Sequence, residues 1–280
     1  MKRERIRNRV KNGGITTFLP SIVTTAGLCF GLLSIGSSVE IAASGGYSAS
    51  GDLIWRAAAF IAIAMVLDML DGKVARAFGI DENRFGVVYD SLSDAVCFGV
   101  APALLVYALF GGAGGAVLKT GLLIYSVCVV LRLARFNMQS SSVEKRSFMG
   151  LPSPMAAGVM ISPILIVSEL GGAPPMDLGI LYAVIAPVTG FFMVSGVRYR
   201  KIGFFNLGRF SGGKKFDILV TSSILIAVVA ASPGVSVAFV SFSYLASGPL
   251  FSILKHFKKR GAEDETGARN FRPPGADGGN

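Results

Sequence analysis

The chain is poor in charge: of its 280 residues only 16% are Asp, Glu, Lys or Arg, whereas 52% are hydrophobic. Because soluble domains carry about 25% charged residues, this composition argues against a water-soluble protein and favours a membrane protein. The three cysteines lie in apolar runs at unrelated spacings, so the sequence has no CxxC metal pattern and no sign of a disulfide framework.

Long apolar runs make up most of the chain. Eight of them approach the roughly 20 residues that a helix needs to cross a bilayer. They extend over 19–39, 53–78, 86–110, 117–136, 151–169, 178–197, 216–232 and 235–254. The sequence therefore predicts an all-α integral membrane protein with about eight transmembrane helices, or six if two weak segments fail to cross. Residues 1–18 form a basic arm, 19–255 the transmembrane domain, and 256–280 a polar, Gly-rich tail predicted to be disordered.

Basic residues are missing from every second loop. The loops around 40–52, 111–116, 170–177 and 232–234 have none, whereas the termini and the other loops hold 25 of the 27 Lys and Arg. By the positive-inside rule, both termini and the junction between the second and third spans face the cytoplasm. We expect a multi-pass protein of the inner cell membrane, with its net charge of +10 explained by topology and anionic lipid rather than by nucleic acid.

Acidic residues are also scarce in the apolar segments, except in the stretch from Leu67 to Asp94. Asp68 and Asp71 lie three residues apart at the end of the second span, and Asp90 and Asp94 lie four apart at the start of the third. On helices these spacings put each pair on one face, and a hairpin would bring the two faces together. Ionisable groups inside membrane helices mark a functional site by default.

Four crowded carboxylates repel one another, and a divalent cation would remove that conflict. Ligation by carboxylates alone, without His or Cys, favours a hard ion such as Mg²⁺ or Mn²⁺. Lys73 and Arg76 follow within two turns and would offer a phosphate its counter-charge, while Gly72 leaves the helix surface open. Together these features suggest phosphoryl-type transfer on a lipid-linked substrate. The alternative, that these acids are ordinary charges solvated at the interface, does not explain two pairs at matched depth.

The pattern Asp68-x2-Asp71-Gly72-x2-Ala75-Arg76, followed after nine residues by Gly86-x3-Asp90-x3-Asp94, resembles the signature of the CDP-alcohol phosphatidyltransferases. The resemblance implies an all-helical membrane enzyme, commonly a homodimer, that moves a phosphatidyl group from a CDP-linked lipid to a small alcohol and releases CMP. The surroundings, from Tyr89 to Ala103, from Arg132 to Asn137 and from Gly150 to Pro154, are most similar to members that use L-serine with CDP-diacylglycerol.

The resemblance also implies roles for single residues. Asp68, Asp71 and Asp90 would hold two divalent metals, and Asp94 would be a further ligand or the general base. The residues expected to contact the CDP portion are Gly72, Ala75, Arg76, Ser21 and Thr24. Ser21 and Gly27 stand where family members often carry asparagines at the start of the first span.

A cationic pair lies at the predicted cytoplasmic end of the fourth span. Arg132 and Arg135 lie three residues apart and, with Asn137, would bind the serine carboxylate or a substrate phosphate. Alternatively, the two arginines are topological residues that snorkel to the interface. In the first span, the small-x3-small pair Gly27 and Gly31 would allow close helix packing.

Two other functions remain open from the sequence. A sister enzyme would use glycerol 3-phosphate, inositol phosphate or another alcohol, or an archaeal-type lipid. A divalent-cation transporter would use the carboxylates as an ion path, but it would need acids across the whole bilayer depth, and the other spans nearly lack them.

Overall fold

The computed structural model describes residues 19–46, 49–77, 84–112, 114–139, 147–172, 175, 177–200 and 231–270. These residues are helical apart from turns and one small sheet, in which β1 (Ser147–Met149) pairs antiparallel with β2 (Arg198–Arg200). The helices are α2 (Leu19–Ala43), α3 (Gly51–Ala77), α4 (Arg84–Asp94), η3 (Ala95–Val100), α5 (Ala101–Phe110), α6 (Gly115–Gln139), α7 (Ser153–Glu169), α8 (Asp177–Val194) and α10 (Pro233–Asn270).

Six stretches of the described residues are long and apolar enough to cross a membrane. They are Ser21–Ala43, Gly51–Gly72, Phe85–Phe110, Gly115–Met138, Asp177–Val194 and Pro233–Phe251, and α7 is a shorter apolar helix. The prediction of an all-α membrane fold is thereby confirmed. Of the predicted apolar segments, 216–232 lies almost entirely outside the described residues, and each of the others coincides with a helix.

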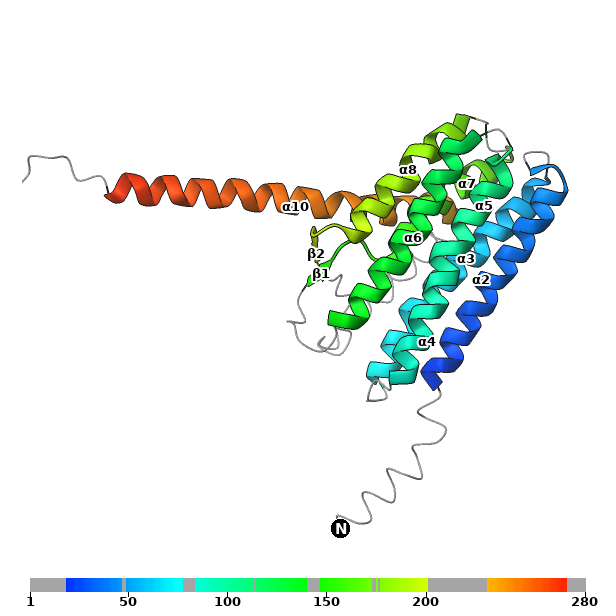
Figure 1. The fold of residues 1–280 in the computed structure, drawn as a ribbon, viewed down its shortest axis with the longest axis horizontal. Coiled ribbons are helices and arrows are strands. Elements are labelled where there is room, and N and C mark those ends of the chain that lie inside the picture. The colour runs from blue at the N-terminus through cyan, green and yellow to red at the C-terminus, as the bar shows by residue number, and fades with distance from the viewer. Residues whose placement is uncertain are drawn as a thin grey trace, which may run out of the picture.

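The helices α2 to α8 form one bundle through which the chain passes back and forth (Figure 1). The start of α2, the end of α3, the start of α4 and the end of α6 lie toward one end, and the connections after α2, α5 and α7 lie toward the other. This alternation is the one that the distribution of basic residues predicts. That the first of these ends faces the cytoplasm stays a prediction.

The third span is not a uniform α-helix. It runs from α4 into the π-helix η3 and then into α5. Two side chains of α6 stabilise the π turn, since the Tyr125 hydroxyl donates to the Phe98 carbonyl at 2.6 Å and the Ser126 hydroxyl donates to the Gly99 carbonyl at 3.2 Å. Single π turns in α-helices are often found at functional sites. Here the π turn begins immediately after Asp94, at the deep end of the acidic stretch.

The glycine pair of α2 packs inside the chain. A Cβ atom on Gly31 would lie 2.5 Å from the Sγ of Cys97, and one on Gly27 would meet Leu67 at 3.7 Å. The prediction of close helix packing is confirmed at Gly31, where a side chain would collide with Cys97 of η3, whereas a Cβ atom at Gly27 would make an ordinary van der Waals contact with Leu67 of α3. All three cysteines are free, as the sequence predicts.

Helix α10 corrects one prediction. It continues through Asn270 and projects beyond the bundle (Figure 1), so residues 256–270 have a helical backbone where the sequence predicts a disordered tail. Extending an existing helix needs no new nucleus, and this segment contains Lys, Arg, Glu and Ala, which favour helix. Residues 271–280 lie outside the described residues.

Gly150 is expected to contribute to stability because it links β1 to α7 with a positive φ of 81°. A Cβ atom there would collide with the Met193 carbonyl oxygen. We expect Gly150→Ala to lower the free energy of unfolding by about 1–3 kcal/mol, measured by thermal unfolding of the purified protein in detergent. Gly36→Ala is the matched control, since no neighbouring atom lies within 4 Å of its added Cβ. Equal melting temperatures for the two variants would contradict this assignment.

Candidate metal centre

Three of the four predicted aspartates converge in space. Asp68 comes from α3, and Asp90 and Asp94 come from α4; one carboxylate oxygen from each lies within 4.8 Å of the others. All three side chains are partly buried. The predicted hairpin, with the two acidic faces turned toward each other, is thus present in the structure.

Asp71 belongs to the same pocket but is held differently. It is 9% exposed, and its Oδ2 accepts a hydrogen bond from the Thr24 hydroxyl of α2 at 3.2 Å. The pocket is lined by all four aspartates together with Thr24, Ser93 and Cys97, as well as apolar residues. Thr24, which was predicted to contact a nucleotide, therefore orients one of the acids. The sequence did not single out Ser93, whose buried hydroxyl has no hydrogen-bond partner among the described residues.

The residues of this pocket fit a divalent metal ion. Their polar atoms are almost all carboxylate and hydroxyl oxygens, which suit Mg²⁺ or Mn²⁺. Three carboxylates within 4.8 Å of one another also create a concentration of negative charge that a cation would neutralise. No histidine lines the pocket, and the one thiol that does, Cys97, donates to the Gly27 carbonyl, so the donor set favours a hard ion over a softer transition metal.

Helix α2 holds the acidic helices together through neighbouring residues. Besides the bond from Thr24 to Asp71, the Thr25 hydroxyl lies 2.9 Å from the Tyr89 hydroxyl of α4. One turn further on, the Cys97 thiol donates to the Gly27 carbonyl at 3.5 Å. Consecutive helical residues point about 100° apart, which explains how the adjacent threonines reach two different helices. Sequence reasoning found Thr24 but missed Thr25 and Tyr89 as contacts.

Arg132 lies beside the acidic pocket. Its Nη1 donates to the hydroxyl of Ser153 at 2.5 Å, and its guanidinium interacts electrostatically with Asp68 and Asp94. Its Nε is buried and has no hydrogen-bond partner among the described residues. Of the predicted acceptor residues, Arg132 is the one whose charge acts on the aspartates.

The other two predicted acceptor residues have different neighbours. Arg135 donates from Nη1 to the Val194 carbonyl at 3.1 Å and contacts the Met149 sulfur. Asn137 donates to the Ser91 hydroxyl of α4 at 3.0 Å. Arg135 therefore lies at the sheet and the end of α8. Asn137 links α6 to α4, the helix that carries Asp90 and Asp94.

The remaining predicted contacts lie along α2 and α3. Gly72 is half-buried directly after Asp71. The backbone carbonyl of Ser21 accepts a hydrogen bond from the Thr25 hydroxyl at 2.6 Å. Ala75 and Arg76 lie in the last turns of α3, and their side chains are outside the described part of the structure. Their predicted contacts with a nucleotide stay predictions.

The amino-acid sequence is similar to those of known enzymes over the region that forms this pocket. A family model described as CDP-alcohol phosphatidyltransferase matches residues 17–195, which include every helix that lines the pocket. The chain is 39% identical over 158 residues to the CDP-diacylglycerol–serine O-phosphatidyltransferase of Mycobacterium leprae. It is 30% identical over 184 residues to the protein of that name from Helicobacter pylori, and 35% identical over 194 residues to the archaetidylserine synthase of Methanothermobacter thermautotrophicus.

These matches cover the relatives to different extents. The alignment with the M. leprae protein covers 55% of this chain and 48% of the relative, so the chain spans about half the length of that protein. The alignment with the H. pylori protein covers 64% and 70%, and that with the M. thermautotrophicus protein covers 67% and 72%. The similarity thus includes the aspartate pocket and leaves α10 outside the region that the family model matches.

Proposed function

The chain belongs to the CDP-alcohol phosphatidyltransferase family, and we propose that it transfers a phosphatidyl group from CDP-diacylglycerol to L-serine, giving phosphatidylserine and CMP. The observation that carries the proposal is the convergence of Asp68, Asp90 and Asp94 within 4.8 Å, with Asp71 in the same pocket. The acidic stretch of the sequence is therefore a single site that could bind the diphosphate of a CDP-lipid through divalent metal.

The names of the relatives support serine as the acceptor more strongly than they support any one lipid as the donor. The relatives from M. leprae and M. thermautotrophicus are named for different lipids, CDP-diacylglycerol in one case and an archaetidyl product in the other, but both names contain serine. A shared acceptor is the simplest explanation of similarity to both. Glycerol 3-phosphate, inositol phosphate and other alcohols are the alternative acceptors.

The four aspartates would hold Mg²⁺ or Mn²⁺, and a bound divalent cation supplies positive charge that offsets the negative charge of the diphosphate. Thr24 keeps Asp71 in place through their hydrogen bond. The residues proposed to contact the CDP portion are Gly72, Ala75, Arg76, Ser21 and Thr24. Gly72 would allow the nucleotide to approach the α3 backbone closely.

Transfer needs a base for the acceptor hydroxyl and a cation for the acceptor's charge. We assign the base to Asp94, which takes the proton as the serine oxygen forms its bond to phosphorus and the bond from phosphorus to CMP breaks. Arg132 is the candidate for binding the serine carboxylate, because its buried Nε makes no hydrogen bond to a described residue. Arg135 and Asn137 would affect acceptor binding indirectly, through the contacts that they make to β1, α8 and α4.

The proposed enzyme is a multi-pass protein of the inner membrane, a homodimer, with its site at the cytoplasmic face. A transporter is less consistent with the positions of the acids. Outside the cluster, Glu40 pairs with Arg56 at 3.3 Å near the connection of α2 to α3, and Asp52 lies close by in the first turn of α3. Among the described residues of α2 to α8, the acids thus gather toward the two ends of the bundle, and no carboxylate between them continues an ion path.

An acceptor panel tests the proposed function. Purified protein is given CDP-diacylglycerol and Mg²⁺ or Mn²⁺ with L-serine, glycerol 3-phosphate or inositol phosphate in separate reactions, and CMP release is measured. We expect serine to be used roughly 100-fold faster than the others, since a site built to bind the charged groups of one substrate rejects analogues strongly. Labelled serine should appear in the lipid fraction. Faster release with another alcohol would replace serine, and metal flux into liposomes without a CDP-lipid would support a transporter.

A further inference from the structure

The π turn of the third span lies between the residues that carry the acids and the residues that anchor the span. Asp94 is the N-cap residue of η3, and most residues of the following helix, α5, are buried. At the end of η3 the Ala101 amide donates to the Val96 carbonyl, five residues back, instead of the four of an α-helix. The π turn therefore sets how α4, with Asp90 and Asp94, is oriented relative to the anchored part of the span.

Two side chains of α6, which runs beside the third span (Figure 1), supply hydrogen-bond donors to this turn. In an α-helix the Phe98 carbonyl would accept from the amide of residue 102, but Pro102 has no N–H. The fully buried Tyr125 donates its hydroxyl to that carbonyl at 2.6 Å, and the Ser126 hydroxyl donates to the Gly99 carbonyl at 3.2 Å. Tyr125 thus supplies a donor that the proline cannot, and it ties the turn to α6.

Helix α2 contacts the same turn at Cys97. The Cys97 thiol donates to the Gly27 carbonyl at 3.5 Å, and Gly31 leaves the space that this side chain occupies. The turn is thereby attached to α6 through one residue and to α2 through the residue before it. A change in the winding of the turn would change how the acids of α4 meet Asp68 and Asp71 of α3.

The π turn is also part of the wall of the acidic pocket. Cys97 and Phe98 line the pocket together with the four aspartates, and the Phe98 backbone is the group that Tyr125 binds. The carboxylate oxygens of the three converging aspartates lie within 4.8 Å of one another. Mg²⁺ tolerates little departure from its preferred coordination geometry. A small displacement of α4 would therefore weaken the site that these acids form.

We propose that Tyr125 is a positioning residue for Asp90 and Asp94. Its hydrogen bond to the Phe98 carbonyl fixes the π turn, and the π turn directs the two carboxylates into the pocket. Tyr125 is not one of the residues that line the pocket, so it acts through the backbone of the third span. This inference rests on the proposed function, because it takes the acidic pocket as the place of phosphatidyl transfer.

The first test replaces Tyr125 in the full-length protein and measures CMP release from CDP-diacylglycerol and serine. Tyr125→Phe keeps the ring and removes only the hydroxyl. We expect kcat to fall by about 10- to 100-fold, because misplacing a reacting group by roughly 1 Å can cost a factor of that size. The KM for serine should stay unchanged, since the substitution leaves the acceptor's own contacts in place.

The binding of Mn²⁺ provides a readout that does not depend on turnover. A ligand that binds only the folded state raises the melting temperature. The rise that Mn²⁺ produces in the unmodified protein should become smaller in Tyr125→Phe, and a higher Mn²⁺ concentration should be needed to reach half of it. The physical reason is that the three carboxylates no longer converge as closely.

Tyr182→Phe is the matched control. Tyr182 is as fully buried as Tyr125, and its hydroxyl also donates to a backbone carbonyl at 2.6 Å, that of Met160 in α7. Both variants lose the same kind of hydrogen bond and should show similar decreases in melting temperature without metal. Because neither Tyr182 nor Met160 lines the acidic pocket, Tyr182→Phe should keep the kcat and the Mn²⁺ response of the unmodified protein. Ser126→Ala, which removes the longer bond to the π turn, should lower kcat by less than Tyr125→Phe.

Failure of this proposal differs from failure of the proposed function. If the unmodified protein releases no CMP with any acceptor, the proposed function fails, and the Mn²⁺ response of the variants still tests the positioning role. The positioning role is overturned if Tyr125→Phe keeps its kcat and its Mn²⁺ response, or if Tyr182→Phe loses as much of both. If Tyr125→Phe does not fold, Ser126→Ala decides by the same two measurements, and unchanged values would overturn the role.

Discussion

Asp90→Asn is expected to abolish CMP release while leaving the protein folded in the membrane. The substitution keeps the size of the side chain and removes one of three carboxylates that lie within 4.8 Å of one another. Loss of a metal ligand of this kind removes several kcal/mol of transition-state stabilisation, which corresponds to a fall of about 1,000-fold or more in kcat/KM. Steady-state release of CMP from CDP-diacylglycerol and serine measures the effect.

Thermal unfolding gives a second readout that does not depend on turnover. Without divalent metal, Asp90→Asn should be at least as stable as the unmodified protein, since it relieves repulsion among the acids of the pocket. A ligand that binds only the folded state raises the melting temperature, so Mn²⁺ should stabilise the unmodified protein and have much less effect on the variant. Lower stability in chelator combined with lost activity would indicate a folding defect instead.

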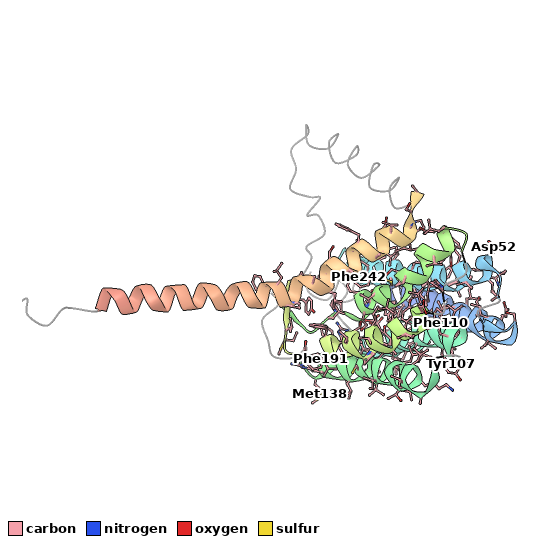
Figure 2. All side chains as sticks on the ribbon, turned by 90° about the horizontal axis from the view of Figure 1, so that it is seen from above. Asp52, Tyr107, Phe110, Met138, Phe191 and Phe242 are labelled. Carbon is pink, nitrogen blue, oxygen red and sulfur yellow. The ribbon has the colours of Figure 1, made fainter. Side chains whose placement is uncertain are left out.

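Asp52→Asn provides the matched control. It makes the same chemical change at an exposed aspartate in the first turn of α3, whereas Asp68 lies near the other end of that helix. Figure 2 shows Asp52 at the end of the bundle opposite to Met138, which lies at the end of α6. Its activity and its response to Mn²⁺ should equal those of the unmodified protein. Near-normal turnover by Asp90→Asn would refute the assignment of this pocket as the metal centre.

The helices and the acidic pocket could be predicted because their signals are local. Apolar runs of membrane-spanning length predict helices directly, and spacings of three and four residues put Asp68 with Asp71 and Asp90 with Asp94 on common faces. Joining the two pairs required only that consecutive spans form a hairpin, which is the shortest connection that the chain can make. The convergence of Asp68 with Asp90 and Asp94 confirms that step.

The partners of these acids could not be predicted, because they depend on how distant segments pack. The bond from Thr24 to Asp71 joins residues 47 positions apart, and the bond between Thr25 and Tyr89 joins residues 64 apart. The π turn after Asp94 depends in the same way on donors from α6, 27 residues further along the chain. Composition and spacing contain no information about such pairs.

The arginines of α6 show the same limit most clearly. Arg132 and Arg135 lie about one helical turn apart, and the sequence gives both of them one role. In the structure Arg132 reaches Ser153 and the acidic pocket, whereas Arg135 reaches the Val194 carbonyl and the sulfur of Met149. Their functions should therefore separate when each is changed in the same way.

Arg132→Lys is expected to lower kcat/KM by about 10- to 100-fold, the range for losing a buried hydrogen bond to a charged group. Lysine keeps the positive charge but is a compact point charge that lacks the planar fork. It cannot donate to Ser153 and still present a second N–H at the position of Nε, which is buried without a hydrogen-bond partner in the described part of the chain. CMP release at varied serine concentration measures this loss, which should appear mainly in the KM for serine.

The same substitution at two other arginines provides the controls for Arg132→Lys. Arg135→Lys should lower kcat/KM only a few-fold, because it gives up contacts with a carbonyl and a sulfur at the end of the bundle rather than beside the aspartates. Arg56→Lys, in the exposed pair with Glu40, should leave turnover unchanged, since surface ion pairs contribute about 0–1 kcal/mol. Equal losses at Arg132 and Arg135 would support a shared role at the membrane surface. A large loss at Arg132 alone would instead mean that the geometry of its guanidinium, held between Ser153 and the acidic pocket, is what the reaction requires.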